Sequence, residues 1–262
     1  MICYMVDIDK YRIGKVFIVI TSLTNLVRYL KEYVTTKNGG YICVSNMRTV
    51  RYANLHDDYL QVMQKSLMNI PDGMPLIWFA RVWGIKNAER TMGPHLFKQM
   101  IDSADLELKH FLLGDTEDTL NRLVERVKEN NGGRIVGTMS PPFCSIDEYD
   151  YEDIVTQIQS SKANIVWLSL SAPKQDFLAA RLTEYLPNVL FIGVGAAFRF
   201  YLGEYKEPKN KVIQKMGLTG LFFRKLNTKE LKWYIVHISW LIKMMVYTLW
   251  QKVLGKQHNS ID

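Results

Sequence analysis

Residues 165–195 read IVWLSLSAPKQDFLAARLTEYLPNVLFIGVG, and this stretch decides the fold. An apolar run, Ile165–Leu170, is followed by a segment with helical spacing of apolar residues, Lys174–Tyr185, and then by a second apolar run, Val189–Gly193. Both runs are apolar except for Ser169, as strands are when helices cover both faces of a parallel sheet. The stretch therefore predicts a β-α-β unit.

The same alternation continues outward along the chain and predicts an α/β fold with a parallel sheet and two Rossmann-like lobes. In such sheets ligands bind beyond the carboxyl ends of the strands, which here are rich in glycine, serine and threonine. Further strands are expected at Val16–Ile20, Tyr41–Val44, Phe111–Leu113 and Arg134–Val136. Further helices are expected at Leu23–Val34, Asp57–Met68, Pro94–Ser103, Glu117–Glu129 and Glu148–Ser161.

Composition excludes several protein classes. The 262 residues are 48% hydrophobic and 23% charged, which is typical of a globular protein and not of a disordered one. The three cysteines are odd in number and form no CxxC pair. A disulfide scaffold and a cysteine-rich zinc site are therefore excluded, and a reducing compartment is indicated.

The net charge of +7 lies entirely in the C-terminal part of the chain. Residues 204–262 hold eleven basic and four acidic side chains, whereas residues 1–203 hold 22 of each. A neutral body with a basic C-terminal appendage, the name used below for residues 204–262, indicates a localised anionic partner.

Within the appendage, residues 231–254 read LKWYIVHISWLIKMMVYTLWQKVL. The lysines interrupt the apolar run and disfavour a membrane-spanning helix. Tryptophan, tyrosine and lysine together favour the lipid–water interface, so we expect a helix docked on a membrane surface. A core helix or a helix between two subunits is the alternative. The N-terminal apolar stretch, residues 16–27, lacks a signal-cleavage site, which predicts a cytoplasmic protein.

Asp72 lies in the sequence Ile70-Pro-Asp-Gly-Met-Pro75, just before a predicted helix. A turn with a helix cap explains such a sequence on its own. Apolar residues flank the carboxylate on both sides, however, and such walls raise a carboxyl pKa toward values useful to a general base. Both interpretations stay open on this observation.

Two other motifs allow a nucleotide interpretation. Gly193-Val-Gly195-Ala-Ala-Phe198 resembles a dinucleotide fingerprint, but phenylalanine replaces the third glycine. No strand that ends in Asp or Glu follows about 20 residues later, so the usual contact to the ribose is missing. Ala172-Pro173-Lys174-Gln175-Asp176 has ordinary helix-start residues, although Lys174 and Gln175 could also hold a diphosphate. No metal is expected, because Asp7-Ile-Asp9 precedes the first predicted strand and the five histidines show no ligand spacing.

Seven segments occur together in one order. They are Asn46; Ile70-Pro-Asp-Gly73; Arg90-Thr-Met-Gly93; Phe111-Leu-Leu-Gly114; Leu170-Ser-Ala-Pro-Lys-Gln-Asp176; Ile192-Gly-Val-Gly-Ala196; and Gly217-Leu218 with Phe223-Arg-Lys-Leu226. In these segments the chain resembles the WecG/TagA/CpsF glycosyltransferases of bacterial envelope polysaccharide synthesis. The chain departs from the family pattern at Val44, Lys206-Glu207-Pro208 and Gly217–Gly220.

The resemblance implies an inverting, metal-independent transfer of a sugar from a UDP donor to a polyprenyl-diphosphate-linked sugar. The sugar would be of the N-acetylmannosamine type, its uronic acid, or glucose. No cofactor is implied, and nucleic acid is not an expected partner. The site would lie on the cytoplasmic face of the plasma membrane, with self-association left open.

By residue, the resemblance implies that Asp72 is the catalytic base and that Arg224 of the appendage contributes to catalysis. Substrate-binding positions are Asn46, Gly73, Gly93, Gly114, Pro173, Lys174, Gln175, Gly193 and Gly195. Residues 1–105 would form the lobe with the PDG motif, residues 106–203 the nucleotide-sugar lobe, and residues 204–262 the membrane-associating appendage. An NAD-type oxidoreductase and a non-catalytic membrane adaptor are the alternatives.

Overall fold

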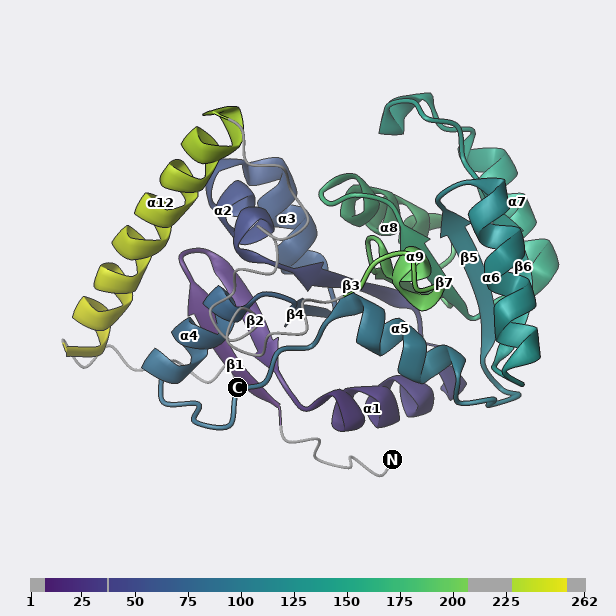
Figure 1. Ribbon diagram of the computed structural model, residues 1–262, viewed down its shortest axis with the longest axis horizontal. Helices are drawn as coiled ribbons and strands as arrows, with labels where there is room; N and C mark the ends of the chain where they lie inside the picture. The colour runs from purple at the N-terminus through teal and green to yellow at the C-terminus, as the bar shows by residue number, and fades with distance from the viewer. Residues whose placement is uncertain (1–7, 37, 207–227, 254–262) are drawn as a thin grey trace.

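A single six-stranded sheet forms the centre of the protein. The computed structural model describes residues 8–36, 38–206 and 228–253, with side chains of the last segment from residue 235 onward. All neighbouring strands of this sheet run parallel, which confirms the predicted α/β fold (Figure 1). The strand order is β4 (Met68–Pro71), β3 (Gly40–Ser45), β8 (Leu190–Gly193), β7 (Ile165–Ser169), β5 (Lys109–Gly114) and β6 (Arg134–Met139).

Both predicted lobes contribute strands to this one sheet. The boundary at residue 105 falls between α5 and β5, and the two parts join where β3 pairs with β8, with Cys43 opposite Gly193. The carboxyl ends of β3 and β8 consequently lie side by side, at the edge of the sheet where all its strands end. The chain between these two strands is about 150 residues long.

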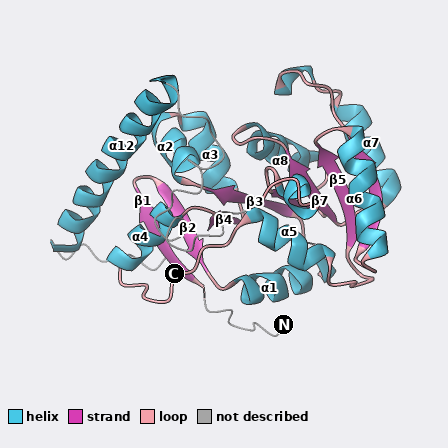
Figure 2. Ribbon diagram, viewed as in Figure 1, coloured by secondary structure: helices cyan, strands magenta, loops and turns pink. Residues whose placement is uncertain are grey.

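Helices cover both faces of the sheet (Figure 2). The largest core cluster contains Trp167 of β7, which is fully buried and packs edge-on against Phe97 at 5.2 Å between ring centroids. One face carries α1 (Leu23–Thr35), α5 (Gly93–Ile101), α6 (Glu117–Glu129) and α9 (Ala197–Tyr201). The other carries α7 (Tyr151–Ser161), preceded by the short helix η1 (Ile146–Glu148), and α8 (Lys174–Tyr185).

A second packing unit lies at the β4 end of the sheet. An antiparallel hairpin of β1 (Asp9–Ile13) and β2 (Val16–Ile20) shares a separate apolar core with neighbouring helices. These are α2 (Met47–Leu55), α3 (Asp57–Lys65) and α4 (Met74–Val82). The C-terminal helix α12 (Thr228–Val253) lies along α2 and α4, so this unit links the appendage to the body (Figure 1).

Two predicted helices are wrong at one end. The helix expected over Glu148–Ser161 begins at Tyr151, because Tyr149 and Asp150 adopt an extended backbone. The helix expected over Asp57–Met68 ends at Lys65, because Ser66 adopts an extended backbone, and Met68 already begins β4. The strand β1 and the helix α2 were not predicted. Helix α2 matters most for the site, since it begins directly after Asn46.

Helix α12 has two apolar faces with different surroundings. Its inner face packs against the body through Trp240, Leu241, Met244 and Met245. Its outer face leaves large apolar side chains exposed: Ile235, Val236, Ile238, Ile242, Val246, Tyr247, Leu249, Trp250 and Val253. Within the described ranges, none of the helices has the length and hydropathy needed to cross a membrane.

Candidate active site

Asp72 and Asn46 are neighbours at the carboxyl ends of β4 and β3. The backbone N–H of Asp72 donates to the Ser45 carbonyl at 2.7 Å. A side chain on Gly73 would approach the Asn46 Cβ to 3.7 Å, so these two turns are in contact. The structure thus brings together the predicted base and the predicted substrate-binding asparagine.

The apolar residues that flank Asp72 in the sequence belong to the buried cores. Ile70, Leu76 and Ile77 are fully buried, whereas the Asp72 side chain itself is half-buried. Gly73 caps α4, and Pro75 stands in its first turn. The turn interpretation and the site interpretation are therefore compatible, because the same segment ends β4, starts α4 and places a half-buried Asp72 at the carboxyl edge of the sheet.

The side chain of Asn46 is fixed by its role as a helix cap. Its Oδ1 accepts from the backbone N–H groups of Arg48 at 3.0 Å and Thr49 at 3.2 Å, and Thr49 Oγ1 accepts from the Asn46 N–H at 3.0 Å. The Asn46 amide NH₂ donates to no group in the described part of the chain. That NH₂ is consequently the group through which Asn46 can contact a substrate.

The segment Arg90–Gly93 joins the β4 end to the β8 end. The Thr91 N–H donates to the Pro71 carbonyl at 2.8 Å, and Thr91 is buried. A Cβ on Gly93 would lie 3.0 Å from the Val194 carbonyl oxygen, so glycine is required for this close approach. The segment encloses the site between the Asp72 turn and the glycine loop.

Gln175 holds the glycine loop that follows β8. Its Oε1 accepts from the Gly195 N–H at 3.0 Å, and a Cβ on Gly193 would lie only 2.7 Å from its Nε2. The side chain is 2% exposed, which leaves little of it for a substrate. The predicted motifs PKQ and GVG thus form one structural unit, in which Gln175 positions the loop.

Asp176 lies beneath this unit and is fully buried. Burial raises its pKa to about 7, although hydrogen bonds from Tyr59 and Cys43 act in the opposite direction. The Tyr59 hydroxyl donates to Oδ2 at 2.5 Å, while Oδ1 has no partner among the described groups. A buried carboxyl with one unsatisfied oxygen favours the protonated form.

We expect Asp176→Asn to stabilise the protein relative to the wild type by an amount that grows between pH 4 and pH 7. The folded state keeps the Asp176 proton up to about pH 7, whereas an unfolded aspartate loses it near about 3.9. The unfolding free energy of the wild type therefore falls with rising pH, by about 4 kcal/mol at most. Denaturant unfolding of both proteins at several pH values measures this difference in unfolding free energy.

His110 makes an opposing contribution to the pH dependence of stability, and the comparison with wild type removes it. Burial lowers the pKa of His110 to about 4, so this group makes both proteins more stable as pH rises from acid toward neutrality. Taking the difference between Asp176→Asn and wild type cancels it. Parallel stability curves for the two proteins would show that Asp176 is ionised throughout.

Pro173 and Lys174 are engaged within the protein. The N–H groups of Gln175 and Asp176 donate to the carbonyls of Ser171 at 3.3 Å and Pro173 at 3.0 Å. The Lys174 ammonium donates to the Cys144 carbonyl at 2.5 Å and lies 4.5 Å from the Tyr149 ring centroid. The start of α8 therefore offers fewer groups to a diphosphate than the sequence suggests.

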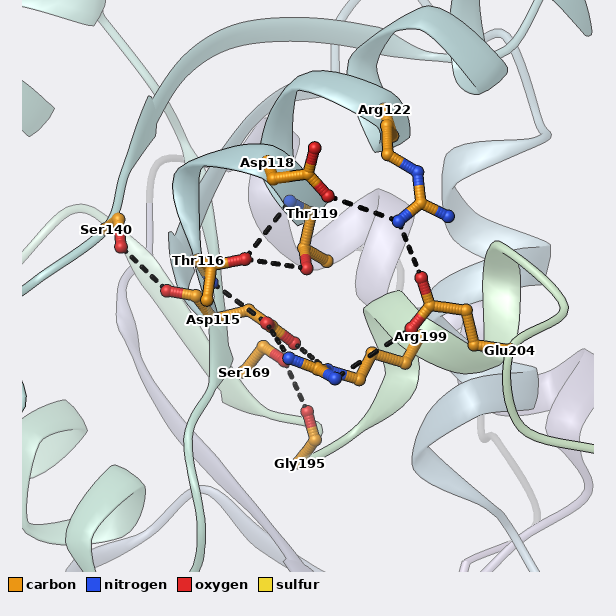
Figure 3. A network of polar contacts seen from close by, with 10 residues as sticks. All are labelled: Asp115, Thr116, Asp118, Thr119, Arg122, Ser140, Ser169, Gly195, Arg199 and Glu204. Atoms are coloured by element: carbon orange, nitrogen blue, oxygen red, sulfur yellow. Dashed lines mark hydrogen bonds and ion pairs between the residues drawn. The ribbon is translucent and has the colours of Figure 1, made fainter.

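A polar network connects the other strand ends (Figure 3). Arg199 of α9 binds Asp115 with two hydrogen bonds, of 2.9 Å from Nε and 2.7 Å from Nη2. Ser169 Oγ donates to the Gly195 carbonyl at 2.6 Å, which ties β7 to the glycine loop. Gly114 lies directly before Asp115 with a φ of +119°, a conformation that favours glycine.

The same network fixes the beginning of the appendage. Glu204 forms ion pairs with Arg122 at 2.8 Å and Arg199 at 3.9 Å (Figure 3). Burial alone would raise the pKa of Asp115, but the hydrogen bonds from Arg199 and the Thr116 N–H outweigh it and lower the pKa. Asp115 thus remains a carboxylate that holds Arg199, and the chain enters the appendage beside the carboxyl edge of the sheet.

The predicted site residues fall into three groups. One group surrounds the ends of β3, β4 and β8: Asn46, Asp72, Gly73, Gly93, Gln175, Gly193 and Gly195. Gly114 lies at the end of β5 beside the Ser169 backbone, and Pro173 and Lys174 lie at the start of α8. Arg224 lies outside the described residues. Arg199 and the arginines of α2 were not predicted, although Arg48 and Arg51 have the spacing of one helix face.

The described residues form neither a cluster of metal ligands nor an open dinucleotide-binding loop. Histidine, cysteine and acidic side chains form no group of three that could hold a metal ion within the described ranges. In a dinucleotide-binding loop, backbone N–H groups face the pyrophosphate, but here the Gly195 N–H is bonded to Gln175. Phe198, in place of the third fingerprint glycine, is fully buried.

Comparison with known proteins assigns the chain. Residues 11–257 match the family described as "Glycosyl transferase WecG/TagA/CpsF family". Two similar proteins are N-acetylglucosaminyldiphosphoundecaprenol N-acetyl-beta-D-mannosaminyltransferases. The one from Bacillus spizizenii strain W23 is 24% identical over 196 residues, and the one from Bacillus subtilis strain 168 is 24% identical over 197 residues. Each match covers 74% of this chain and 75% of the relative. Motifs, fold and match agree, and the chain belongs to the WecG/TagA/CpsF family of glycosyl transferases.

Proposed function

We propose that this protein transfers a sugar from a UDP donor to a polyprenyl-diphosphate-linked sugar, with inversion at the anomeric carbon. The observation that carries the proposal is the contact between the Asp72 turn and the capped Asn46 at the carboxyl edge of the sheet. Ligands of parallel α/β sheets bind at this edge. The family assignment and the names of the two relatives support the reaction class.

In the proposed reaction Asp72 acts as the general base. The acceptor hydroxyl oxygen forms a bond to the anomeric carbon from the face opposite UDP, and the bond between that carbon and the UDP oxygen breaks. UDP leaves with the electron pair, and Asp72 takes the hydroxyl proton.

The acceptor class follows from the relatives. Their names describe transfer of N-acetylmannosamine to N-acetylglucosaminyl diphosphoundecaprenol. We infer that this chain uses an acceptor of the same type, a sugar on a polyprenyl diphosphate. The donor sugar is proposed to be N-acetylmannosamine, its uronic acid or glucose.

We propose that Arg224 of the appendage stabilises the leaving diphosphate. Arg224→Ala is expected to lower kcat about tenfold to hundredfold, because a hydrogen bond to a charged group contributes about 1.5–3 kcal/mol. Membrane binding should stay nearly unchanged, since ten other basic side chains of the appendage remain. Steady-state kinetics and vesicle sedimentation of the same preparation measure both. A variant with normal kcat would remove Arg224 from the site.

Transfer is expected to continue in excess EDTA. The proposal assigns the charge of the leaving diphosphate to protein groups, so removal of divalent cations should leave the rate unchanged. UDP release is followed before and after chelation, with Mg²⁺ and Mn²⁺ added back in parallel. Loss of activity with recovery on adding either ion would contradict metal independence.

We further propose that the appendage binds the membrane in which the acceptor resides. The outer face of α12 exposes apolar side chains along its described length, and the appendage contains the whole net charge of +7. Apolar side chains next to basic ones favour the surface of anionic lipids. The protein would then work as a peripheral enzyme on the cytoplasmic face of the plasma membrane.

One screen tests the function against its alternatives. Purified protein is incubated with each UDP-sugar and a short-chain polyprenyl-diphosphate-linked acceptor, and the products are analysed by mass spectrometry. Transfer from one UDP-sugar supports the proposal. Stabilisation by NADH but not by UDP would indicate an oxidoreductase, and tight vesicle binding with no affinity for UDP would indicate an adaptor.

A further inference from the structure

A pocket of about 270 Å³ lies between α2, α3, the start of α8 and α12, next to the candidate active site. It is called the arginine pocket here. Its lining includes Arg48 and Arg51 of α2, Tyr59 of α3, Pro173 before α8, and His237 of α12. Two guanidinium groups and an imidazole line the arginine pocket, and its described lining residues include no carboxylate.

The two arginines hold different positions. Arg48 Nη2 donates to the Ala172 carbonyl at 2.5 Å, which fixes its guanidinium beside the start of α8. Arg51 Nε is buried and has no hydrogen-bond partner among the described groups. A buried donor without an acceptor is rare in native proteins and calls for a partner. Nε is shielded from the pocket, so an anion there meets the other guanidinium nitrogens of Arg48 and Arg51, which no carboxylate of the described lining neutralises.

The size of the arginine pocket limits its ligand. Pockets for whole drug-sized ligands measure about 300–1,000 Å³, and this one lies just below that range at 270 Å³. It suits a small anionic group better than an entire nucleotide sugar. Arginine forks match phosphate oxygens, so a diphosphate is the fitting chemical class.

The position of the arginine pocket indicates which substrate supplies the diphosphate. On one side Thr49 shares the cap of α2 with Asn46 of the candidate site. On the other side stands α12, whose outer face is apolar and exposed. With its diphosphate in this pocket, a lipid-linked acceptor would have its sugar toward Asn46, and its hydrocarbon chain would leave past α12.

We propose that the arginine pocket binds the diphosphate of the polyprenyl-linked acceptor. This inference rests on the proposed function and adds the residues that hold the acceptor. The donor UDP also contains a diphosphate, and the experiment below separates the two sources.

The test uses the full-length protein and its Arg51→Gln variant. Affinities for farnesyl diphosphate, inorganic pyrophosphate and UDP are measured by calorimetry. We expect the affinity for farnesyl diphosphate and pyrophosphate to fall about tenfold to hundredfold in the variant, with UDP binding unchanged. Arg51→Lys keeps the charge but loses the guanidinium fork, so its loss should be smaller.

Arg28→Gln is the matched control. Arg28 is an exposed arginine of α1, on the opposite face of the sheet, where its guanidinium donates to Asn25 at 3.1 Å. All three affinities should equal those of wild type. Thermal unfolding shows whether each variant is folded. If Arg51→Gln does not fold, the affinities are measured on Arg51→Lys instead.

Two results overturn the inference. Unchanged affinity for farnesyl diphosphate in both Arg51 variants would mean that the arginine pocket holds no diphosphate. A loss of UDP affinity equal to that of farnesyl diphosphate would assign it to the donor. Either result leaves the proposed function intact if wild-type protein transfers sugar, whereas absence of transfer from every UDP-sugar would overturn the function itself.

Discussion

Asp72→Asn is expected to lower kcat by at least about a hundredfold, since general base catalysis contributes about 10²–10⁴. Asparagine has the size of aspartate and keeps the backbone bond to the Ser45 carbonyl, but it cannot take the proton of the acceptor hydroxyl. The affinity for UDP should stay unchanged. Initial rates at saturating donor and acceptor measure the effect.

Asp115→Asn provides a comparison for Asp72→Asn. Asp115 is also a carboxylate at a strand end, but its two oxygens are occupied by Arg199. Its replacement should affect stability and the placement of α9 more than the proton transfer. Near-normal turnover of Asp72→Asn would remove Asp72 from the mechanism and leave it as a turn residue.

The double variant Ile242→Asn/Val246→Asn is expected to lose about a hundredfold in binding to anionic vesicles. These side chains lie on the outer face of α12, where they are 56% and 61% exposed. Each large apolar side chain buried in lipid contributes about 1.5–3 kcal/mol, so the pair contributes about 3 kcal/mol or more. Vesicle sedimentation at several protein-to-lipid ratios measures the loss.

Leu106→Asn is the control for this double variant, because Leu106 is 77% exposed in the loop after α5. It should bind vesicles as wild type does. High salt should release only part of the wild-type protein, since salt screens the lysines and not the apolar contacts. Unchanged binding of the double variant would favour the alternative that the outer face packs against another subunit.

The strands with long apolar runs could be predicted from the sequence. The short strand β4, which lies next to the second core, could not. Strands β7 and β8 are apolar except for Ser169 at the end of β7, and α6 and α8 were predicted with their observed ends. Strand β4 has four residues, too few for a period, and follows a helix whose apolar spacing continues into it. The pairing of β3 with β8 has no local signal at all, because it joins segments distant in sequence.

The candidate site shows a similar division. The resemblance identified Asp72 and Asn46, and the structure places their turns in contact. Gln175 was expected to bind substrate, but the structure shows that its amide oxygen holds the glycine loop. The arginine pocket depends on three helices and on α12, so the motifs by themselves gave no sign of it.

Acceptor-dependent release of UDP tests the proposed sugar transfer directly. Purified full-length protein is given a UDP-sugar chosen by the screen, with and without a polyprenyl-diphosphate-linked N-acetylglucosamine acceptor. The account predicts one UDP released for each sugar transferred, a product of inverted anomeric configuration, and no UDP release without acceptor. A product that retains the donor configuration, or a full rate of UDP release without acceptor, would contradict it.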